Sequence, residues 1–495
     1  MDLSLAHRSR WHWLTLNRLV TIIVFIAIFA MAARFPLDTD SWWHLQSGRW
    51  IVEHRAVPGS DPFSHTRFGQ PWIDHGWLAQ AILYLVYAGA GYGGLVLALA
   101  ALVTAAFFFS WLQCPQGDCW LRAFVFVVAA VASGIIWAVR PQMVSFVLAA
   151  IVAYLLYLYK QGATRAIWWL PLVVLVWVNI HGGFAIAFIL IAAYLFGEVG
   201  NQIGRLGTEN TDVARPLGWR GIGHLLLVTV VCILVLPLNP NGFQMWAYPF
   251  RTVGIDVLQD FIVEWQSPNF HAFYLHPFIW LLLAALTAFG LAGRRADFTD
   301  LTLVALFAYL SLLAVRNIPL FALVTAPIIV RYGTLALRQW RGTREIKQTS
   351  FVALNWLLLL LVLGAALAYV MQTAQAAEEE AAQPEGLPAG AVAYLQEEQP
   401  PGPIYNDYNW GGYLIWRLPR YPVFVDGRTD LYDDAFLRQY LSIYTAEEGW
   451  ERKLREQGIN LVLIAAQSPL ARALDAQPGW HLAYEDSVAV VYTRR

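Results

Sequence analysis

Residues 37–50 read LDTDSWWHLQSGRW and directly follow the first long apolar segment, residues 18–36. Carboxylates are costly inside hydrocarbon, so Asp38 and Asp40 place this stretch at a membrane face. Adjacent tryptophans such as Trp42 and Trp43 are typical of the headgroup zone, where the ring is half buried and its N–H is hydrated, and they are expected to anchor the stretch there. From Asp40 onward apolar side chains recur at helical spacing, which predicts an amphipathic helix lying on the membrane.

The composition indicates a polytopic membrane protein. Of 495 residues, 58% are hydrophobic and 14% are charged, which is more apolar surface than a soluble protein needs. The formal net charge of -1 argues against nucleic acid as a partner. Cys114 and Cys119 form a C-x4-C pair without the two further ligands of a structural zinc site. The first apolar segment has basic flanks and no small-residue cleavage site, so it is expected to remain as an anchor.

Apolar runs long enough to span a membrane occur about eleven times if about 17–20 residues cross the hydrocarbon. They are residues 18–36, 93–112, 121–139, 142–159, 166–180, 182–197, 223–238, 276–292, 299–315, 318–334 and 351–371. Basic residues gather before the first span and in alternate connections: His7, Arg8, Arg10, Arg18, Lys160, Arg165, Arg205, Arg215, Arg220, Arg294, Arg295, Arg331, Arg338, Arg341, Arg344 and Lys347. The positive-inside rule then predicts a cytoplasmic N-terminus and an extracytoplasmic C-terminus.

The chain is expected to consist of three parts. Residues 1–375 form the transmembrane domain, and its first external loop, residues 37–92, carries a second amphipathic run at 77–87 and therefore two surface helices. Residues 376–390 (AAEEEAAQPEGLPAG) are a predicted linker. Residues 391–495 form a small α/β domain on the outer side.

The α/β domain is predicted from short apolar runs and helix signals. The predicted strands are 403–406, 422–425, 460–465, 480–484 and 487–492, and the predicted helices are 389–398, 434–443, 446–457 and 468–474. Thr445 and Glu448 have the spacing of a capping box for the third helix.

Three acids of the first external loop are candidates for proton transfer. Asp40 is the predicted catalytic base, Asp38 is the second choice and Asp74 a possible helper, because a carboxylate can remove the proton of an attacking hydroxyl. The alternative is that Asp38 and Asp40 cap the following helix, although one cap needs only one acid.

Two arginines lie at the outer ends of spans, against the usual bias of basic residues. Arg140 precedes Pro141 and Arg316 precedes Asn317, so both are expected at the mouths of a cavity. They are predicted to bind the phosphate of a lipid donor, with His181 and His276 as further phosphate ligands. The alternative is that these arginines snorkel or form salt bridges.

Other polar residues on the same face are candidates for binding the acceptor or the sugar. They are His44, His75, Glu264, Asp407, Asp426 and Arg428. Loops at strand ends are frequent ligand positions, and Asp407 lies in the run 405–413 (YNDYNWGGY) after a predicted strand. The alternatives are a structural, interfacial role for His44 and a packing surface against the membrane domain for 405–413.

The run Asp40-Ser41-Trp42-Trp43-His44, continued by residues 49–52 and 61–63, resembles the first-loop motif of oligosaccharyltransferase catalytic subunits. These are GT-C integral-membrane glycosyltransferases, and the resemblance implies many spans, a polyprenyl- or dolichyl-phosphate sugar donor and Asp40 as the essential acid. Residues 407–413 resemble their Trp-Trp-Asp-Tyr-Gly segment without its paired tryptophans. The metal-dependent members carry a second acidic motif in a later external loop, for which Glu264 is the only acid in place. In length the chain is more similar to bacterial mannosyltransferase and aminoarabinose transferase types, which use a monophosphate donor.

The function predicted is that of a hexosyltransferase in the bacterial cytoplasmic membrane. It would move a sugar from a polyprenyl phosphate to a protein, lipid or glycan acceptor on the outer side, with inversion, among membrane lipids. One alternative is an oligosaccharyltransferase-like enzyme that needs a divalent metal. The others are a transporter or flippase of a lipid-linked anion, which would show repeated halves, and a non-catalytic scaffold.

Overall fold

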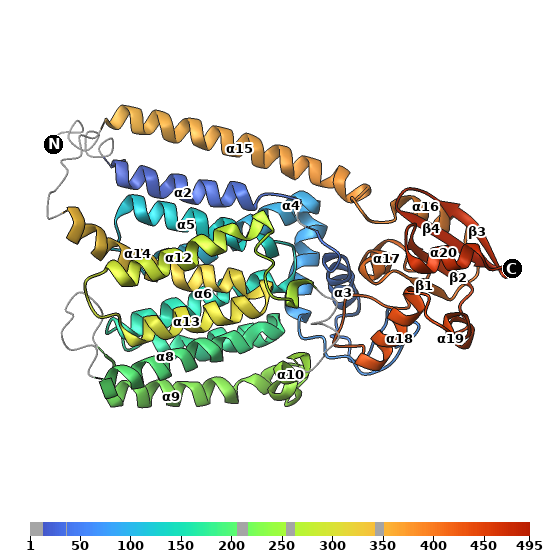
Figure 1. The fold of residues 1–495 in the computed structure, drawn as a ribbon, viewed down its shortest axis with the longest axis horizontal. Coiled ribbons are helices and arrows are strands. Elements are labelled where there is room, and N and C mark those ends of the chain that lie inside the picture. Colours follow the sequence, from blue (N-terminus) through green and yellow to red (C-terminus); the bar gives the residue numbers. More distant parts are fainter. Residues whose placement is uncertain (1–12, 36, 205–215, 254–262, 342–350) are drawn as a thin grey trace.

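The computed structural model describes residues 13–35, 37–204, 216–253, 263–341 and 351–495. In it a long helical bundle carries a smaller α/β domain at one end (Figure 1). Among the basic residues used to orient the chain, His7, Arg8, Arg10, Arg205, Arg215, Arg344 and Lys347 lie outside the described ranges.

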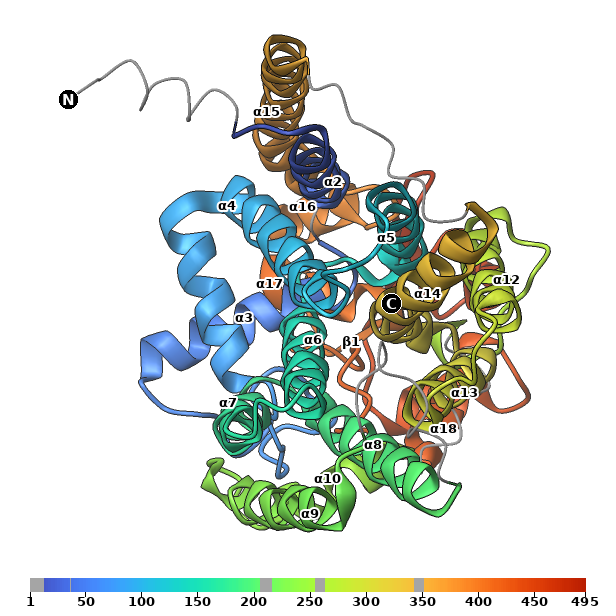
Figure 2. The same cartoon turned by 90° about the vertical axis from the view of Figure 1, so that its left-hand side faces the viewer.

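The bundle consists of apolar helices that run along its long axis (Figures 1 and 2). They are α2 (Leu16–Ala32), α4 (Trp77–Trp111), α5 (Cys119–Ser133), α6 (Pro141–Lys160), α7 (Leu170–Ile180), α8 (Ala185–Gly204), α9 (Gly218–Leu234), α12 (His276–Leu291), α13 (Phe298–Leu313), α14 (Ile318–Arg341) and α15 (Val352–Ala382). Short 3-10 turns extend several of them: η1 (Gly134–Ile136), η2 (Ala166–Trp169), η3 (Gly182–Phe184), η4 (Leu236–Leu238), η6 (Phe273–Leu275) and η7 (Val315–Asn317).

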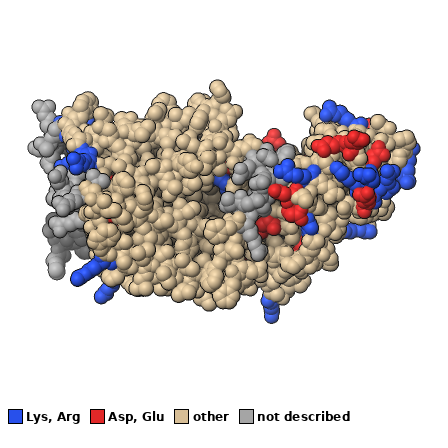
Figure 3. Space-filling model, turned by 60° about the horizontal axis from the view of Figure 1, so that its bottom comes forward, with Lys and Arg blue, Asp and Glu red and all other residues tan. Residues whose placement is uncertain are grey.

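Every predicted span coincides with one of these helices. Within the described ranges, eight helices are long and apolar enough to cross a membrane. The shorter apolar helices Leu16–Ala32, Ala166–Ile180 and Phe298–Leu313 fall on the three remaining predicted spans. The protein is therefore an α-helical integral membrane protein, with an uncharged belt between two charged ends (Figure 3).

The predicted first external loop, residues 37–92, crosses the end of the bundle that carries the small domain (Figure 1). Helix α3 (Ser41–His54) lies there, and α4 contains two helices joined at Gly91, whose φ of 61° suits glycine. Residues 77–90 before this kink match the predicted second surface helix. Helix α3 packs between α4 and α17 (Gly411–Arg417).

The tryptophan pair is buried, so the predicted membrane anchor is wrong. Trp42 is 1% and Trp43 6% exposed. The ring of Trp42 makes an edge contact with Tyr413 of α17 at 5.1 Å, and the ring of Trp43 one with Trp72 at 6.4 Å. The two indoles join the bundle to the small domain, and the sequence alone does not distinguish an interface with protein from one with lipid.

The small domain contains one four-stranded sheet in the order β1-β2-β4-β3. Strands β1 (Ile404–Asn406) and β2 (Leu461–Ala465) are parallel, and β4 (Ala489–Arg494) is antiparallel to β2 and to β3 (Trp480–Glu485). Its helices are α16 (Ala389–Glu398), α17, α18 (Asp434–Tyr444), α19 (Trp450–Glu456) and α20 (Pro469–Asp475), with the 3-10 turn η8 (Tyr408–Trp410). Four predicted strands and all four predicted helices are present.

Two local predictions for this part are wrong, and one helix was not predicted. Helix α19 starts at Trp450 after Gly449 with φ 83°, so the capping box of Thr445 and Glu448 does not form. Residues 411–417 form α17, whose two leading glycines hid its helical signal. Helix α15 continues to Ala382 and so takes up the first part of the predicted linker.

The segment 422–425 is not a strand, because it has only a short partner. Val423 forms an isolated bridge with Ser64 of the first external loop. His65 N donates to Val423 O at 3.0 Å, and Val423 N donates to Phe63 O at 3.1 Å. The preceding Pro422 has no N–H to extend a ladder, so this contact serves to dock the small domain on the loop.

Candidate functional site

Three carboxylates converge on Arg140 at the end of the bundle that carries the small domain. Arg140 precedes α6, with Pro141 in its first turn. Its guanidinium contacts Asp38 through Nε, Asp40 Oδ2 at 2.9 Å and Glu264 Oε1 at 2.9 Å. Glu264 comes from η5 (Val263–Trp265), far away in the sequence. Burial by itself would lower the pKa of Arg140, and the three carboxylates reverse this and raise it.

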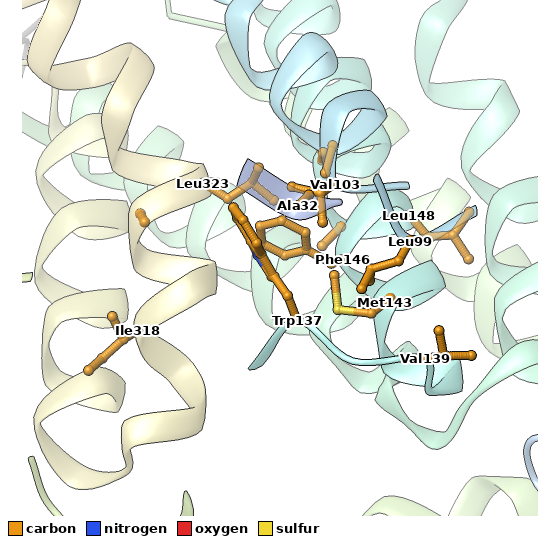
Figure 4. Close-up of a cluster of buried hydrophobic side chains, with 14 of the residues drawn as sticks. Ala32, Leu99, Val103, Trp137, Val139, Met143, Phe146, Leu148, Ile318 and Leu323 are labelled. Carbon is orange, nitrogen blue, oxygen red and sulfur yellow. The ribbon is translucent and has the colours of Figure 1, made fainter. Parts of the chain in front are cut away.

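The turn that carries Arg140 is held in place by the apolar core and by Arg34. Trp137 packs in the apolar core beside Phe146 and Leu323, as Figure 4 shows. Arg34, at the end of α2, donates from Nη2 to the carbonyls of Gly134 and Trp137, at 2.6 Å each. The sequence analysis missed Arg34, although an arginine that ends an apolar span is a detectable signal.

Asp38 and Asp40 have different surroundings. Asp38 Oδ1 accepts from Asp40 N, Ser41 N and Ser41 Oγ at 3.1, 2.9 and 2.9 Å, and so it caps α3. The side chain of Asp40 makes no capping bond. Its Oδ1 accepts from Trp43 Nε1 at 3.2 Å. The capping alternative therefore applies to Asp38, and Asp40 faces a cavity.

The environment of Asp40 favours a proton acceptor that works near neutral pH. Burial raises the pKa of Asp40 to about 6, Arg140 opposes the rise, and Asp38 and Glu264 add to it. Its side chain is 26% exposed. A carboxyl group with this pKa is ionised at pH 7 and remains a stronger base than an ordinary aspartate.

Among the described residues, no carboxylate forms an ion pair with Arg316. It lies in η7, and its guanidinium stacks on the ring of Trp265 at 4.2 Å. Val315 N donates to Gln266 O at 3.0 Å, so η7 lies beside the turn that carries Glu264. Across the described residues Arg316 makes no hydrogen bond or ion pair, while Glu264, Arg140 and Asp40 lie within electrostatic range. Such an arginine favours an anion.

His181 is held as a neutral hydrogen-bond donor. Gly183 N–H donates to its Nδ1 at 3.1 Å, so Nδ1 is an acceptor and the proton of the neutral ring is on Nε2. Ser145 Oγ lies 2.9 Å from the same Nδ1 and accepts from Trp177 Nε1 at 2.6 Å. Burial, followed by His75, Arg316 and Arg140, lowers the pKa of His181 well below its usual value.

The other loop residues form two small networks. His75 Nδ1 lies 2.6 Å from the hydroxyl of Tyr248 and 3.8 Å from Asp430 Oδ2. Asp74 Oδ1 accepts from Gln80 Nε2 at 2.8 Å, and that nitrogen is 3.3 Å from His44 Nδ1.

The second network lies inside the protein, beneath α3. His44 is 6% exposed and Asp74 is 1% exposed. Burial raises the pKa of Asp74 to about 6 and lowers that of His44. This placement fits the structural role favoured for His44, although that role was predicted at the membrane interface. Asp74 does not line the cavity that Asp40 faces.

A cavity of about 490 Å³ is lined both by Asp40 and by residues of the small domain. Its lining includes Asp40, Arg140 and Glu264 on one side and Asp407 on the other. The small domain approaches Asp40 closely, because a Cβ on Gly427 would overlap Asp40 Oδ1 and one on Gly412 would overlap Thr39 O. The sequence analysis treated neither glycine as part of the site.

Three predicted site residues lie elsewhere. The Nε2 of His276 faces Phe270 O at 3.3 Å, away from the cluster. Arg428 is 1% and Asp426 0% exposed, and Arg428 bonds Asp426 twice and Asp61 Oδ1 once, at 2.7–2.8 Å. These two residues join the small domain to the first loop, so the geometry contradicts their predicted part in acceptor binding.

The carboxylates do not fit a divalent cation in this arrangement. Asp38, Asp40 and Glu264 surround a guanidinium, and a metal ion in their midst would place two further positive charges beside Arg140. Within the described residues, no group of three or more His, Cys, Asp or Glu side chains is placed to hold a metal ion. Cys114 and Cys119 of the C-x4-C pair belong to no such group.

No protein-family model and no curated protein sequence matches the chain. Solved structures do. The apo oligosaccharyltransferase of Archaeoglobus fulgidus is 12% identical with a TM-score of 0.55, over 98% of this chain and 75% of that one. The Archaeoglobus fulgidus oligosaccharyltransferase AglB in complex with an inhibitory peptide and a dolichol-phosphate is 12% identical, with a TM-score of 0.53, over 96% of this chain and 74% of that one. ArnT from Cupriavidus metallidurans bound to undecaprenyl phosphate is 15% identical, with a TM-score of 0.50, over 96% of this chain and 97% of that one.

At these identities the likeness shows a shared fold. The chain has the GT-C fold, as the resemblance of its first-loop motif predicted.

Proposed function

We propose that this protein is an inverting membrane glycosyltransferase that takes a hexose from a polyprenyl-phosphate carrier. The observation that carries the proposal is that Arg316, which makes no ion pair within the described residues, lies within electrostatic range of the carboxylate cluster around Arg140. The cation supplies a place for a phosphate and the acids supply a base. The fold supports the same conclusion, since two of the similar structures, those of AglB and ArnT, hold a dolichol-phosphate and undecaprenyl phosphate.

Each residue has one task in the proposed reaction. Asp40 takes the proton of the acceptor hydroxyl, whose oxygen bonds the anomeric carbon of the donor sugar. The bond from that carbon to the phosphate oxygen breaks, and its electron pair leaves with the lipid phosphate. Arg316 and the Nε2–H of His181 stabilise the leaving phosphate. This single displacement inverts the anomeric centre.

The role of Arg140 differs from the sequence prediction. Its guanidinium is engaged by three carboxylates, so it holds the acids in position rather than binding the phosphate directly. The metal-dependent alternative lacks support, because the acids surround this guanidinium.

We also propose a cytoplasmic N-terminus and an extracytoplasmic small domain in a bacterial cytoplasmic membrane. Lys and Arg gather at the bundle end away from the small domain (Figure 3). Described members of this set include Arg220, Arg338 and Arg341. This distribution follows the positive-inside rule.

The experiment compares Arg316→Ala with the wild type in nanodiscs, using an undecaprenyl-phosphate hexose as donor. Loss of a charge-assisted contact costs about 1.5–3 kcal/mol, so the donor KM should rise by about 10–100-fold. Arg338→Ala, at the opposite end of the bundle, is the matched control. An unchanged KM would remove Arg316 from the donor site. Lipid flipping that persists in Asp40→Asn, without sugar transfer by the wild type, would instead identify a flippase.

A further inference from the structure

The cavity that faces Asp40 has a second wall, which comes from the small domain. This wall consists of side chains from η8, from the turn before α18 and from α18 itself. They are Asp407, Tyr408, Asn409, Thr429, Leu437, Tyr440, Leu441 and Tyr444. The reaction centre is therefore built by two parts of the chain that lie far apart in the sequence.

The aromatic part of this wall is rigid. The hydroxyl of Tyr444 donates to Asp407 Oδ2 at 3.0 Å, and that of Tyr440 accepts from Tyr408 N at 2.8 Å. The ring of Tyr440 stacks on those of Tyr405 and Tyr444, with centroids 5.4 and 6.0 Å away. These contacts fix the rings before any ligand binds, which lowers the entropic cost of binding.

Three polar groups of the wall remain free for a ligand. The Tyr408 hydroxyl, the Asn409 amide and the Thr429 hydroxyl make no side-chain hydrogen bond to a described residue. The main-chain N–H groups beside them are occupied, since Asn409 N donates to Asp407 Oδ1 at 3.0 Å and Thr429 N to Gly427 O at 2.9 Å. A peptide that binds as an added strand needs free main-chain groups, whereas sugar hydroxyls match the groups that are free.

The charge of the lining disfavours an anion. Its acids within the described residues are Asp40, Glu264 and Asp407, and its one basic residue, Arg140, is bonded to carboxylates. A phosphate or carboxylate here would meet uncompensated negative charge. The volume of about 490 Å³ falls in the range of about 300–1,000 Å³ of small-molecule sites.

We propose that this cavity is the acceptor site and that it takes an uncharged saccharide. The inference rests on the proposed function and adds the substrate class. The tyrosine rings contact the apolar face of the sugar ring, and Tyr408, Asn409 and Thr429 bond its hydroxyls. One hydroxyl is thereby directed to Asp40, which takes its proton while the oxygen bonds the donor carbon. The donor phosphate lies outside this cavity, at Arg316.

The experiment measures binding of methyl β-D-glucopyranoside to the full chain in nanodiscs by saturation-transfer NMR. Glucose 6-phosphate and N-acetyl-serinamide serve as the charged and peptide probes. Tyr408→Phe should weaken binding of the glycoside by about 2–10-fold, as expected for one hydrogen bond. Tyr394→Phe is the matched control, because this tyrosine of α16 does not line the cavity. Asp40→Asn should still bind the glycoside.

Donor turnover forms the second arm. In hydrolysis of the undecaprenyl-phosphate hexose by water, without acceptor, the donor KM should be the same in Tyr408→Phe as in the wild type, because the donor phosphate lies at Arg316. A raised donor KM in that variant would assign the cavity to the donor sugar and overturn the proposal. Preference for either control probe, or equal effects of Tyr408→Phe and Tyr394→Phe, would also overturn it. If only the proposed function fails, the glycoside binds and no donor is consumed.

Discussion

Replacing Asp40 by asparagine is expected to lower the rate of sugar transfer by about 10²–10⁴-fold, the usual contribution of a general base. The fold should survive. Asparagine has the same shape and keeps one oxygen that can accept from Trp43 or Arg140, and Arg140 retains Asp38 and Glu264. The lost charge-assisted bond is partly exposed, so the change in the free energy of unfolding should be about 1 kcal/mol.

Asp38→Asn is the matched control, because Asp38 is separated from Asp40 by Thr39 alone. Asp38 serves as the cap of α3, and asparagine caps a helix about as well as aspartate. We expect transfer within about tenfold of the wild-type rate, well short of the loss of a general base. The assay is transfer of radiolabelled sugar from undecaprenyl phosphate, with thermal unfolding in detergent as the check on folding. If Asp40→Asn keeps a tenth of the wild-type rate, or Asp38→Asn loses as much as Asp40→Asn, the assignment of the base is wrong.

Three further outcomes are expected. Protonated Asp40 cannot accept a proton, and burial raises its pKa to about 6. The kcat/KM should therefore fall about tenfold for each pH unit below 6. The same fall should occur in Asp74→Asn, and its absence from that variant would show that Asp74 is the group that titrates. Arg428→Met leaves Asp61 and Asp426 buried without their cation, so the free energy of unfolding should fall by about 3–5 kcal/mol. The measurement is the melting temperature, with Arg420→Met as a control at an exposed position. An unchanged melting temperature in Arg428→Met would contradict this prediction. A chelator should leave transfer unchanged, and a loss reversed by Mg²⁺ or Mn²⁺ would show a metal requirement.

The bundle could be predicted because its signal is local. A run of about 20 apolar residues needs no partner elsewhere to be read as a span, and even the short runs at 166–180 and 182–197 became α7 and α8. The sheet of the small domain was predictable for the same reason, since its apolar strands lie between turn residues. The prediction was wrong where a neighbour decides the structure, as at 422–425, whose partner is residue 64.

The site was predictable in residue types but not in pairings. The two arginines were selected because basic residues are uncommon at the outer ends of spans, and Glu264 because it is the only acid in place for a second acidic motif. That Arg140 contacts three carboxylates, while Arg316 contacts none among the described residues, depends on contacts between residues 100 or more positions apart in the sequence. Tyr408 was missed as a ligand group because a tyrosine next to tryptophan and glycines has the pattern of packing.

The docking of the small domain limits how an acceptor can arrive. Arg428 is buried between Asp61 and Asp426, and the adjacent Gly427 lies against Asp40. Swinging the domain away would part Arg428 from Asp61 and open the buried contact between Trp42 and Tyr413, and burial of one large apolar side chain alone is worth about 1.5–3 kcal/mol. Since each 1.4 kcal/mol is a tenfold change in population, the opened form would be rare. The acceptor must therefore reach Asp40 with the domain in place, through the cavity between its tyrosine wall and the bundle, and the domain belongs to the reaction centre rather than to a lid.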